Sequence, residues 1–272
     1  MATTSSQSHP AARDRDLTGR VALVTGGTRG IGAAICHALA ADGAAVAAGY
    51  SSNQARADEL RQSIEAEGGT LSLHQGNIAD AEDCERTVKE VIEQHGRLDI
   101  LVNNAGITVD KAVSKMSAAD WDKVLKVDLS GAFYMSKPAI EHMIGRGSGR
   151  IINISSVGGE MGNIGQVNYT AAKSGLFGLT KTLAKEAALA LRVAGTLEKG
   201  IGVTVNCVTP GLTHTDMVVT IPPFLLAEMV EQIPVHRMGE PEEIARVVSF
   251  LAQDASGYIT GQIWDVDGGL NM

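Results

Sequence analysis

Apolar and polar residues follow one another along this chain in blocks of two kinds. Seven short runs are almost continuously apolar. They cover residues 20–26, 44–50, 71–77, 98–106, 149–156, 202–211 and 261–269. Between several of them lie longer stretches with apolar positions every three or four residues, such as 55–68 and 81–96, which both end in Gly. The first pattern is typical of strands buried on both faces, and the second of amphipathic helices.

Strands of this kind separated by helices predict a parallel sheet with right-handed crossovers and helices on both faces. The interior shows no Pro-, Gly- or Ser-rich linker and no repeat. We therefore expect an α/β fold with one Rossmann-type doubly wound domain and a seven-stranded parallel sheet over residues 18–272. Residues 1–17 are polar and lack the apolar centre of a secretory signal, so we interpret them as a flexible tail. Residues 213–235 interrupt the alternation with apolar and Pro residues, and we interpret them as a flap over a site.

Charge and composition disfavour several classes of partner. The 272 residues include 23 Lys and Arg against 31 Asp and Glu, a formal net charge of −8, without a dense basic stripe. We therefore expect no binding to nucleic acid or to an anionic membrane surface. No run of 18 apolar residues occurs, so we expect no membrane span. The three Cys are widely spaced and the His residues lack metal-ligand spacing, which predicts buried thiols, no metal site and, by default, a cytoplasmic protein.

The stretch TGGTRGIG, residues 25–32, connects the first expected strand to the first helix. Gly26, Gly30 and Gly32 allow a sharp turn and a close approach to a ligand, and a helix N-terminus offers N–H groups and a positive dipole end. Both features suit a pyrophosphate. The spacing is looser than G-x-G-x-x-G and the Lys of a P-loop is missing, so the turn taken alone is equally compatible with tight packing.

The residues after the second expected strand bear on the choice of cofactor. Tyr50, Ser51 and Ser52 stand where an Asp or Glu would bind the ribose 2′-hydroxyl of NAD. No acid is present there to repel a 2′-phosphate, and Arg29 in the glycine turn is a potential bidentate donor to it. The sequence therefore favours NADP(H). The alternative is that Arg29 is simply solvated.

Four stretches occur in a fixed order: TGGTRGIG, NNAG (103–106), NISS (153–156) with YTAAK (169–173) shortly after it, and PGLTHT (210–215). Together they resemble the short-chain dehydrogenase/reductase family over about residues 18–272. Each motif alone is a weak signal, but four in this order are specific. The stretches GITVDKAVSKM and GQVNYTAAKSGL further resemble the branch that contains 3-oxoacyl-carrier-protein reductases and acetoacetyl-CoA reductases.

The resemblance implies roles for a catalytic group. Tyr169 would donate a proton to a substrate carbonyl, Ser156 would orient the carbonyl oxygen, and Lys173 would hold the ribose of the nicotinamide end. An ordinary phenol has a pKa of about 10, and an ammonium group one helical turn away favours the phenolate, so the Tyr–Lys spacing fits this chemistry. The catalytic Asn of the family, which holds a proton-relaying water, is replaced by Asp128. A carboxylate accepts hydrogen bonds but does not donate them, and it adds negative charge near Lys173. The alternative is an Asp that only bonds neighbouring backbone.

The resemblance also implies a set of cofactor contacts. They are Gly26, Thr28, Arg29, Gly30, Ile31, Gly32, Tyr50, Ser51, Ser52, Asn77, Ile78, Asn104, Ala105, Gly106, Tyr169, Lys173, Pro210, Gly211, Thr213 and Thr215. Ser156, Met161, Gln166 and Tyr169 would bound the substrate pocket together with the flap. The apolar flap residues Met217, Ile221, Phe224, Leu225, Leu226 and Met229 would contact an acyl chain or, alternatively, form a buried helix face.

The implied reaction is the NADPH-dependent reduction of a 3-oxoacyl thioester, acetoacetyl-CoA or a short 3-oxoacyl-CoA, to the (R)-3-hydroxyacyl thioester. The alternatives are a 3-oxoacyl-carrier-protein reductase, a broader alcohol or steroid dehydrogenase, and a non-catalytic NADP(H)-binding regulatory protein. Arg146 and Arg150 precede the fifth strand as basic residues for docking a carrier protein, and residues 192–200 lengthen a connection. The family commonly forms tetramers, and the small residues of 168–191 suit helix packing, so we expect a homotetramer.

Overall fold

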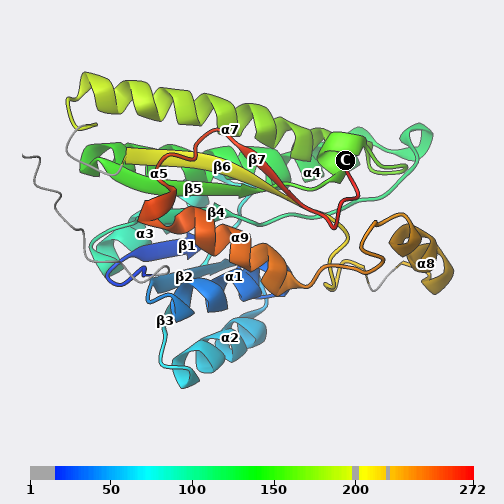
Figure 1. Cartoon of the computed structure of the whole chain (residues 1–272), viewed down its shortest axis with the longest axis horizontal. Coiled ribbons are helices and arrows are strands. Elements are labelled where there is room, and N and C mark those ends of the chain that lie inside the picture. Colours follow the sequence, from blue (N-terminus) through cyan, green and yellow to red (C-terminus); the bar gives the residue numbers. More distant parts are fainter. Residues whose placement is uncertain (1–15, 198–201, 219–220) are drawn as a thin grey trace, which may run out of the picture.

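The computed structural model describes residues 16–197, 202–218 and 221–272. Within them seven strands form one parallel sheet in the order β3-β2-β1-β4-β5-β6-β7 (Figure 1). The strands are β1 Val21–Val24, β2 Ala45–Tyr50, β3 Thr70–Gln75, β4 Ile100–Asn103, β5 Ser148–Ile154, β6 Gly202–Pro210 and β7 Ile263–Val266. Each predicted apolar run overlaps one strand, and β3 and β5 begin one residue before their runs. The predicted α/β doubly wound fold is therefore confirmed.

Helices cover both faces of this sheet. They are α1 Gly30–Ala41, α2 Gln54–Ala66, α3 Ala81–His95, α4 Ala118–Leu125, α5 Gly131–Arg146, α6 Gly158–Met161, α7 Val167–Val193, α8 Pro223–Glu231 and α9 Pro241–Ala252. Alternate residues of β1 enter two separate apolar clusters, because side chains of a strand point to opposite faces. Ala22 and Val24 pack with α1, α2 and α9, whereas Val21 and Leu23 pack with α3, α5 and α7.

The chain joins the fold slightly earlier than the sequence indicated. Leu17, which we assigned to the tail, is 1% exposed and belongs to the cluster under α1 and α9. Its backbone N–H donates to the carbonyl of Asp42 at 2.7 Å. An isolated apolar residue at the edge of a polar stretch thus anchors the start of the domain. Residues 1–15 of the proposed tail lie outside the described residues.

The motif residues gather at one edge of the sheet because all seven strands are parallel. The glycine turn follows β1, NNAG ends and follows β4, NISS ends β5, and PGLTHT follows β6. The carboxyl ends of parallel strands lie at the same edge, where open α/β sheets bind their ligands. The fold therefore brings the four motifs together.

The two arginines considered for docking a carrier protein lie elsewhere. Arg146 ends α5 and Arg150 lies near the start of β5, at the amino edge of the sheet. Arg150 is buried and donates to the carbonyls of Gly149 and Gly202 at 2.8 and 3.0 Å. Its guanidinium thus satisfies buried backbone oxygens, and its proposed role in docking is wrong.

The interrupting segment contains helix α8, which begins at Pro223 directly after Pro222. Pro suits the first helical position, where its missing N–H has no intrahelical partner in any case. None of the residues of α8 is buried, and Phe224 is 66% exposed. The alternative interpretation of this apolar stretch as a buried helix face is therefore wrong for α8 in this chain. Residues 219 and 220 of the segment lie outside the described part.

Candidate active site

The glycine turn after β1 has a backbone that only Gly adopts comfortably. Gly26 and Gly30 have φ values of +60° and +51°. A Cβ on Gly32 would lie 2.2 Å from the carbonyl oxygen of Gly26, inside any tolerable contact. Helix α1 begins at Gly30, and the side chain of Arg29 does not cap it. The turn therefore forms a cradle in front of the N–H groups of α1, which fits the diphosphate of a dinucleotide.

Two side chains connect this turn to the end of β4. Thr25 Oγ1 accepts hydrogen bonds from the N–H groups of Asn104 and Ala105 at 3.0 and 3.1 Å. In return, Asn104 Nδ2 donates to the carbonyls of Thr25 and Gly26 at 3.0 and 3.1 Å. These reciprocal bonds hold the NNAG loop against the glycine turn. Sequence reasoning missed Thr25, although it opens the glycine motif.

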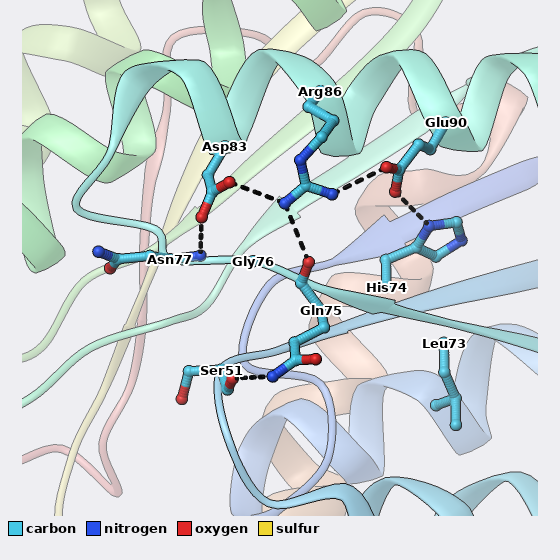
Figure 2. A pocket seen from close by; sticks show the side chains of 9 residues that line it. All are labelled: Ser51, Leu73, His74, Gln75, Gly76, Asn77, Asp83, Arg86 and Glu90. Carbon is cyan, nitrogen blue, oxygen red and sulfur yellow. Dashed lines mark hydrogen bonds and ion pairs between the residues drawn. The ribbon is translucent and has the colours of Figure 1, made fainter.

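Beside the ends of β2 and β3 lies a cavity of about 570 Å³. Asp83 on α3 accepts from the backbone N–H of Asn77 at 2.9 Å and from Arg86 at 2.8 Å. Arg86 also donates to the carbonyl of Gln75 at 3.2 Å, and Gln75 Nε2 donates to the carbonyl of Ser51 at 2.9 Å (Figure 2). This network fixes the loops that carry two of the predicted adenosine contacts. The lining residues are Ser51, Leu73, His74, Gln75, Gly76, Asn77, Asp83, Arg86 and Glu90.

Helix α7 carries the tyrosine and lysine of YTAAK on one face. The Nζ of Lys173 lies 5.6 Å from the ring centroid of Tyr169, which is half-buried. Ser155 Oγ donates to the carbonyl of Lys173 at 2.8 Å and so connects the end of β5 to α7. Ser156, the next residue, accepts from the N–H of Gly158 at 3.1 Å. A Cβ on Gly158 would lie 3.4 Å from Ser156 Oγ and 3.8 Å from Thr170, in the first turn of α7.

Asp128 lies beside Lys173 in a π-helical turn, Lys126–Ser130, between α4 and α5. Its carboxylate is 1% exposed, accepts from the backbone N–H of Ile107 at 2.9 Å, and lies 3.5 Å from Lys173 Nζ. Lys173 also donates to the carbonyl of Ile154 at 3.0 Å. Asp128 thus bonds backbone 21 residues away and also pairs with the lysine, so the interpretation as an Asp that only bonds neighbouring backbone is wrong.

Burial and charge act against each other in this pair. Burial raises the pKa of Asp128, while the positive charge of Lys173 and the Ile107 N–H act in the opposite direction. Burial lowers the pKa of Lys173, but the neighbouring Asp128 carboxylate is the largest of the influences that outweigh burial, and the pKa of Lys173 is raised. A Cβ on Gly106 would lie 2.8 Å from Asp128 Oδ2 and 3.3 Å from Lys173 Nζ. The NNAG loop therefore closes directly over the pair.

A second charged group forms around Arg29. Arg29 Nη1 lies 4.0 Å from Asp216 Oδ2, and Arg56 Nη1 of α2 lies 2.5 Å from the same oxygen. Thr215 lies against the glycine turn, 3.3 Å from where a Cβ on Gly30 would be. Arg29 therefore faces a carboxylate and is not merely solvated. Sequence reasoning missed Arg56 and Asp216; Asp216 follows the last motif directly, whereas Arg56 is 160 residues away and carries no local signal.

Comparison with known proteins decides the family. A family model described as "Enoyl-(Acyl carrier protein) reductase" matches residues 26–271. The chain is 46% identical to a 3-oxoacyl-[acyl-carrier-protein] reductase of Synechocystis over 94% of this chain and 98% of that protein. It is 47% identical to an acetoacetyl-CoA reductase of Rhizobium meliloti over 92% of this chain and 98% of that protein. The chain belongs to the short-chain dehydrogenase/reductase family.

A solved structure supports the same assignment. A dehydrogenase/reductase from Sinorhizobium meliloti superposes with a TM-score of 0.86 at 36% identity, over 95% of this chain and 98% of that one. As a short-chain reductase, the protein is an oxidoreductase that works with a nicotinamide cofactor. The glycine cradle, which any added Cβ would fill, fits the diphosphate of such a cofactor. In the described ranges, no helix is long and apolar enough to cross a membrane.

Two of the residues predicted for the substrate side of this reductase, Gln166 and Tyr169, lie at the start of α7. Gln166 Nε2 donates to Asp110 at 3.0 Å, and the N–H of Lys111 donates to the carbonyl of Gly165 at 2.8 Å. These bonds connect the loop after β4 to the segment before Tyr169. Met161, at the end of α6, is 54% exposed and free to meet a ligand from solvent.

Proposed function

We propose that this protein reduces a 3-oxoacyl thioester to the (R)-3-hydroxyacyl thioester with NADPH, with acetoacetyl-CoA or another short 3-oxoacyl-CoA as substrate. The observation that carries the proposal is the Tyr169–Lys173 pair on α7, together with Ser156, which follows β5 at the same edge of the sheet as the glycine turn. The names of the two similar reductases support a 3-oxoacyl group as the reacting part of the substrate.

Each residue of the group has a separate task. Ser156 holds the carbonyl oxygen by a hydrogen bond at the point where negative charge develops. Tyr169 donates the proton to that oxygen, and the Lys173 ammonium, 5.6 Å from the centre of the Tyr169 ring, supplies a positive charge beside it. The bound nicotinamide cofactor supplies the hydride. The contacts implied by the family resemblance would hold the cofactor, from the glycine turn and the ends of β2, β3 and β4 to Pro210, Gly211, Thr213 and Thr215.

Asp128 takes a positioning role in this proposal. Its carboxylate fixes the Ile107 N–H, and with it the loop that carries Asn104 to Gly106, and it holds Lys173 by charge. An Asn in this place would give the hydrogen bond without the charge. The replacement of the family Asn by Asp128 favours a non-catalytic protein when the sequence is taken alone, but the ion pair with Lys173 supports a role beside the catalytic group. The names of the two similar proteins, both reductases, also support catalytic activity in this chain.

A CoA handle fits this chain better than a carrier protein. Arg146 and Arg150 lie at the amino edge of the sheet, away from the motifs, so they do not supply the basic residues that dock a carrier protein at the mouth. Residues 211–236, which follow β6, contain no Lys or Arg. Reduction of 3-oxoacyl carrier protein is the second candidate, because the Synechocystis relative bears that name.

We also propose a homotetramer in the cytoplasm. Phe133 of α5 and Leu189 and Val193 of α7 are 45%, 52% and 80% exposed, and apolar side chains of this size favour burial against another copy. The three Cys are all buried and free, as in proteins of reducing compartments.

The proposal is tested by following NADPH absorbance with acetoacetyl-CoA and with an acetoacetyl carrier protein as substrates. Chiral analysis of the product determines its configuration. We expect turnover with the CoA ester, an (R) product, and a loss of kcat of about 10²- to 10⁴-fold in Tyr169→Phe with NADPH binding retained. Tight NADPH binding without oxidation by either thioester would reject the reductase proposal. Faster turnover of the carrier-protein ester would favour the second candidate.

A further inference from the structure

One carboxylate joins three separate segments at the edge of the sheet where the cofactor motifs lie. Asp216 follows β6, Arg29 belongs to the glycine turn after β1, and Arg56 lies in the first turn of α2, after β2. The distances from Asp216 Oδ2 are 2.5 Å to Arg56 and 4.0 Å to Arg29. The loops after β1 and β2 hold the adenosine half of a dinucleotide in this fold. Both arginines therefore stand where a ribose 2′-substituent is recognised.

Arg86, further along the same edge, is engaged differently. It forms ion pairs with Asp83 and Glu90 from its own helix, both at 2.8 Å, and donates to the carbonyl of Gln75 (Figure 2). Those carboxylates raise the pKa of Arg86 and fix its guanidinium within α3. A ligand phosphate would have to break several local bonds to recruit it. Arg29 and Arg56, in contrast, share a single acid that comes from a distant part of the chain.

We propose that Asp216 determines cofactor specificity as a competing anion: it occupies the Arg29–Arg56 pair in the free protein, and the 2′-phosphate of NADP(H) replaces it there. The inference rests on the proposed use of NADP(H). A phosphate monoester carries up to two negative charges near neutral pH and three acceptor oxygens. Two guanidinium groups therefore bind a phosphate monoester more strongly than they bind a single carboxylate. NAD(H) has no such group and leaves the Asp216 contacts in place.

The exposure of the three side chains indicates how strongly Asp216 can affect the affinity for NADPH. All three side chains are about half exposed, with 44% to 63% of their surface accessible. Exposed ion pairs contribute little, so Asp216 weakens the hold on the phosphate without preventing it. A reductase that must release its oxidised cofactor after each turnover gains from such a competitor, because the arginines regain a partner as the phosphate leaves.

Binding titrations of NADPH and NADH to Asp216→Asn test the inference. We expect NADPH to bind Asp216→Asn about threefold more tightly than it binds the parent protein, and NADH to bind both equally. The effect is small because the competing charge that is removed is exposed. Arg56→Ala should weaken NADPH about tenfold and NADH little, and Asp216→Asn should have a smaller effect in that background. Glu65→Gln, an exposed acid on the same helix as Arg56, is the matched control and should leave both affinities unchanged.

The outcomes separate this inference from the proposed function. Weaker NADPH binding in Asp216→Asn, an equal change for NADH, or no change at all would overturn the competition and leave Asp216 as a support for its segment. A parent protein that binds NADH as tightly as NADPH would overturn the cofactor proposal itself, and the inference with it. Melting temperatures of the variants establish that each change in affinity comes from a folded protein.

Discussion

Two carboxylate–cation groups stand at the same edge of the sheet, and burial gives them different properties. Asp128 and Lys173 are both nearly inaccessible to water, whereas Asp216 and its two arginines are about half exposed. Charges shielded from water interact strongly and cannot easily lose a partner, while exposed charges are screened and exchange partners at little cost. The first group is suited to hold a catalytic lysine in one place. The second is suited to exchange its acid for a ligand.

Removal of the buried cation should have the largest effect. Lys173→Ala leaves Asp128 as an unpaired buried carboxylate, which costs about 3–5 kcal/mol of unfolding free energy, and it removes the charge that activates Tyr169. The loss of Lys173 also removes an influence that lowers the pKa of Asp128, so that pKa rises further. Asp128 then has a higher pKa in the folded than in the unfolded protein, so the stability of Lys173→Ala relative to the parent protein should fall as pH rises through the folded-state pKa. Chemical denaturation at several pH values measures both effects.

Lys185→Ala is the control for that experiment, because Lys185 lies on the same helix and is exposed. Its stability should match the parent protein within about 0.5 kcal/mol. If Lys173→Ala were as stable as this control, or if its loss of stability relative to the control did not grow as pH rises, the buried ion pair would not have the importance that its geometry indicates.

A larger side chain at Gly106, in the loop that covers Asp128 and Lys173, should have the next largest effect on stability. In Gly106→Ala the new Cβ would lie 2.8 Å from Asp128 Oδ2 and 3.3 Å from Lys173 Nζ, and both of these residues are buried. We expect a loss of about 1–3 kcal/mol of stability, as in other overpacked sites, and reduced kcat. Gly145→Ala in α5 is the matched control, since nothing lies within 4 Å of its added Cβ and Ala favours a helix. Equal melting temperatures for the two variants would contradict the tight contact.

The sequence predicts features that depend on neighbouring residues, but not contacts between residues that are far apart along the chain. The strands, the glycine turn and the Tyr169–Lys173 spacing were predictable because periodicity and i, i+4 neighbours are local properties. The replacement of the family Asn by Asp128 was visible too, but its bond to Ile107 was not. Burial of Arg150 and the meeting of Arg56 with Asp216 could not be predicted, because both depend on which segments the sheet order brings together. Exposure, which separates the two charged groups, is likewise a property of the assembled fold.

Neutralising the buried acid should alter the pH dependence more than the rate. The charge of Asp128 is one cause of the raised pKa of Lys173, so in Asp128→Asn the pKa of Lys173 falls. Because Lys173 acts as an ammonium group, the loss of reductase activity at alkaline pH should begin at a lower pH than in the parent protein, with kcat at neutral pH changed by less than about tenfold. Asp122→Asn, an exposed acid in α4, should reproduce the parent pH–rate profile. An unshifted profile in Asp128→Asn would reject its electrostatic role.

The smallest effect should come from the exposed group, and salt should reveal it. Arg29→Ala removes one of the two cations near Asp216, and we expect NADPH to bind about fivefold more weakly with NADH little affected. Salt at 1 M shortens the screening length to about 3 Å, less than the 4.0 Å between Arg29 and Asp216, so the difference between variant and parent should shrink there. The pH–rate profile set by Lys173 should not move with salt, because Lys173 and Asp128 are both buried. Equal losses for both cofactors in Arg29→Ala would count against NADP(H), and a profile that shifts with salt would mean that the catalytic pair is less shielded than its burial indicates.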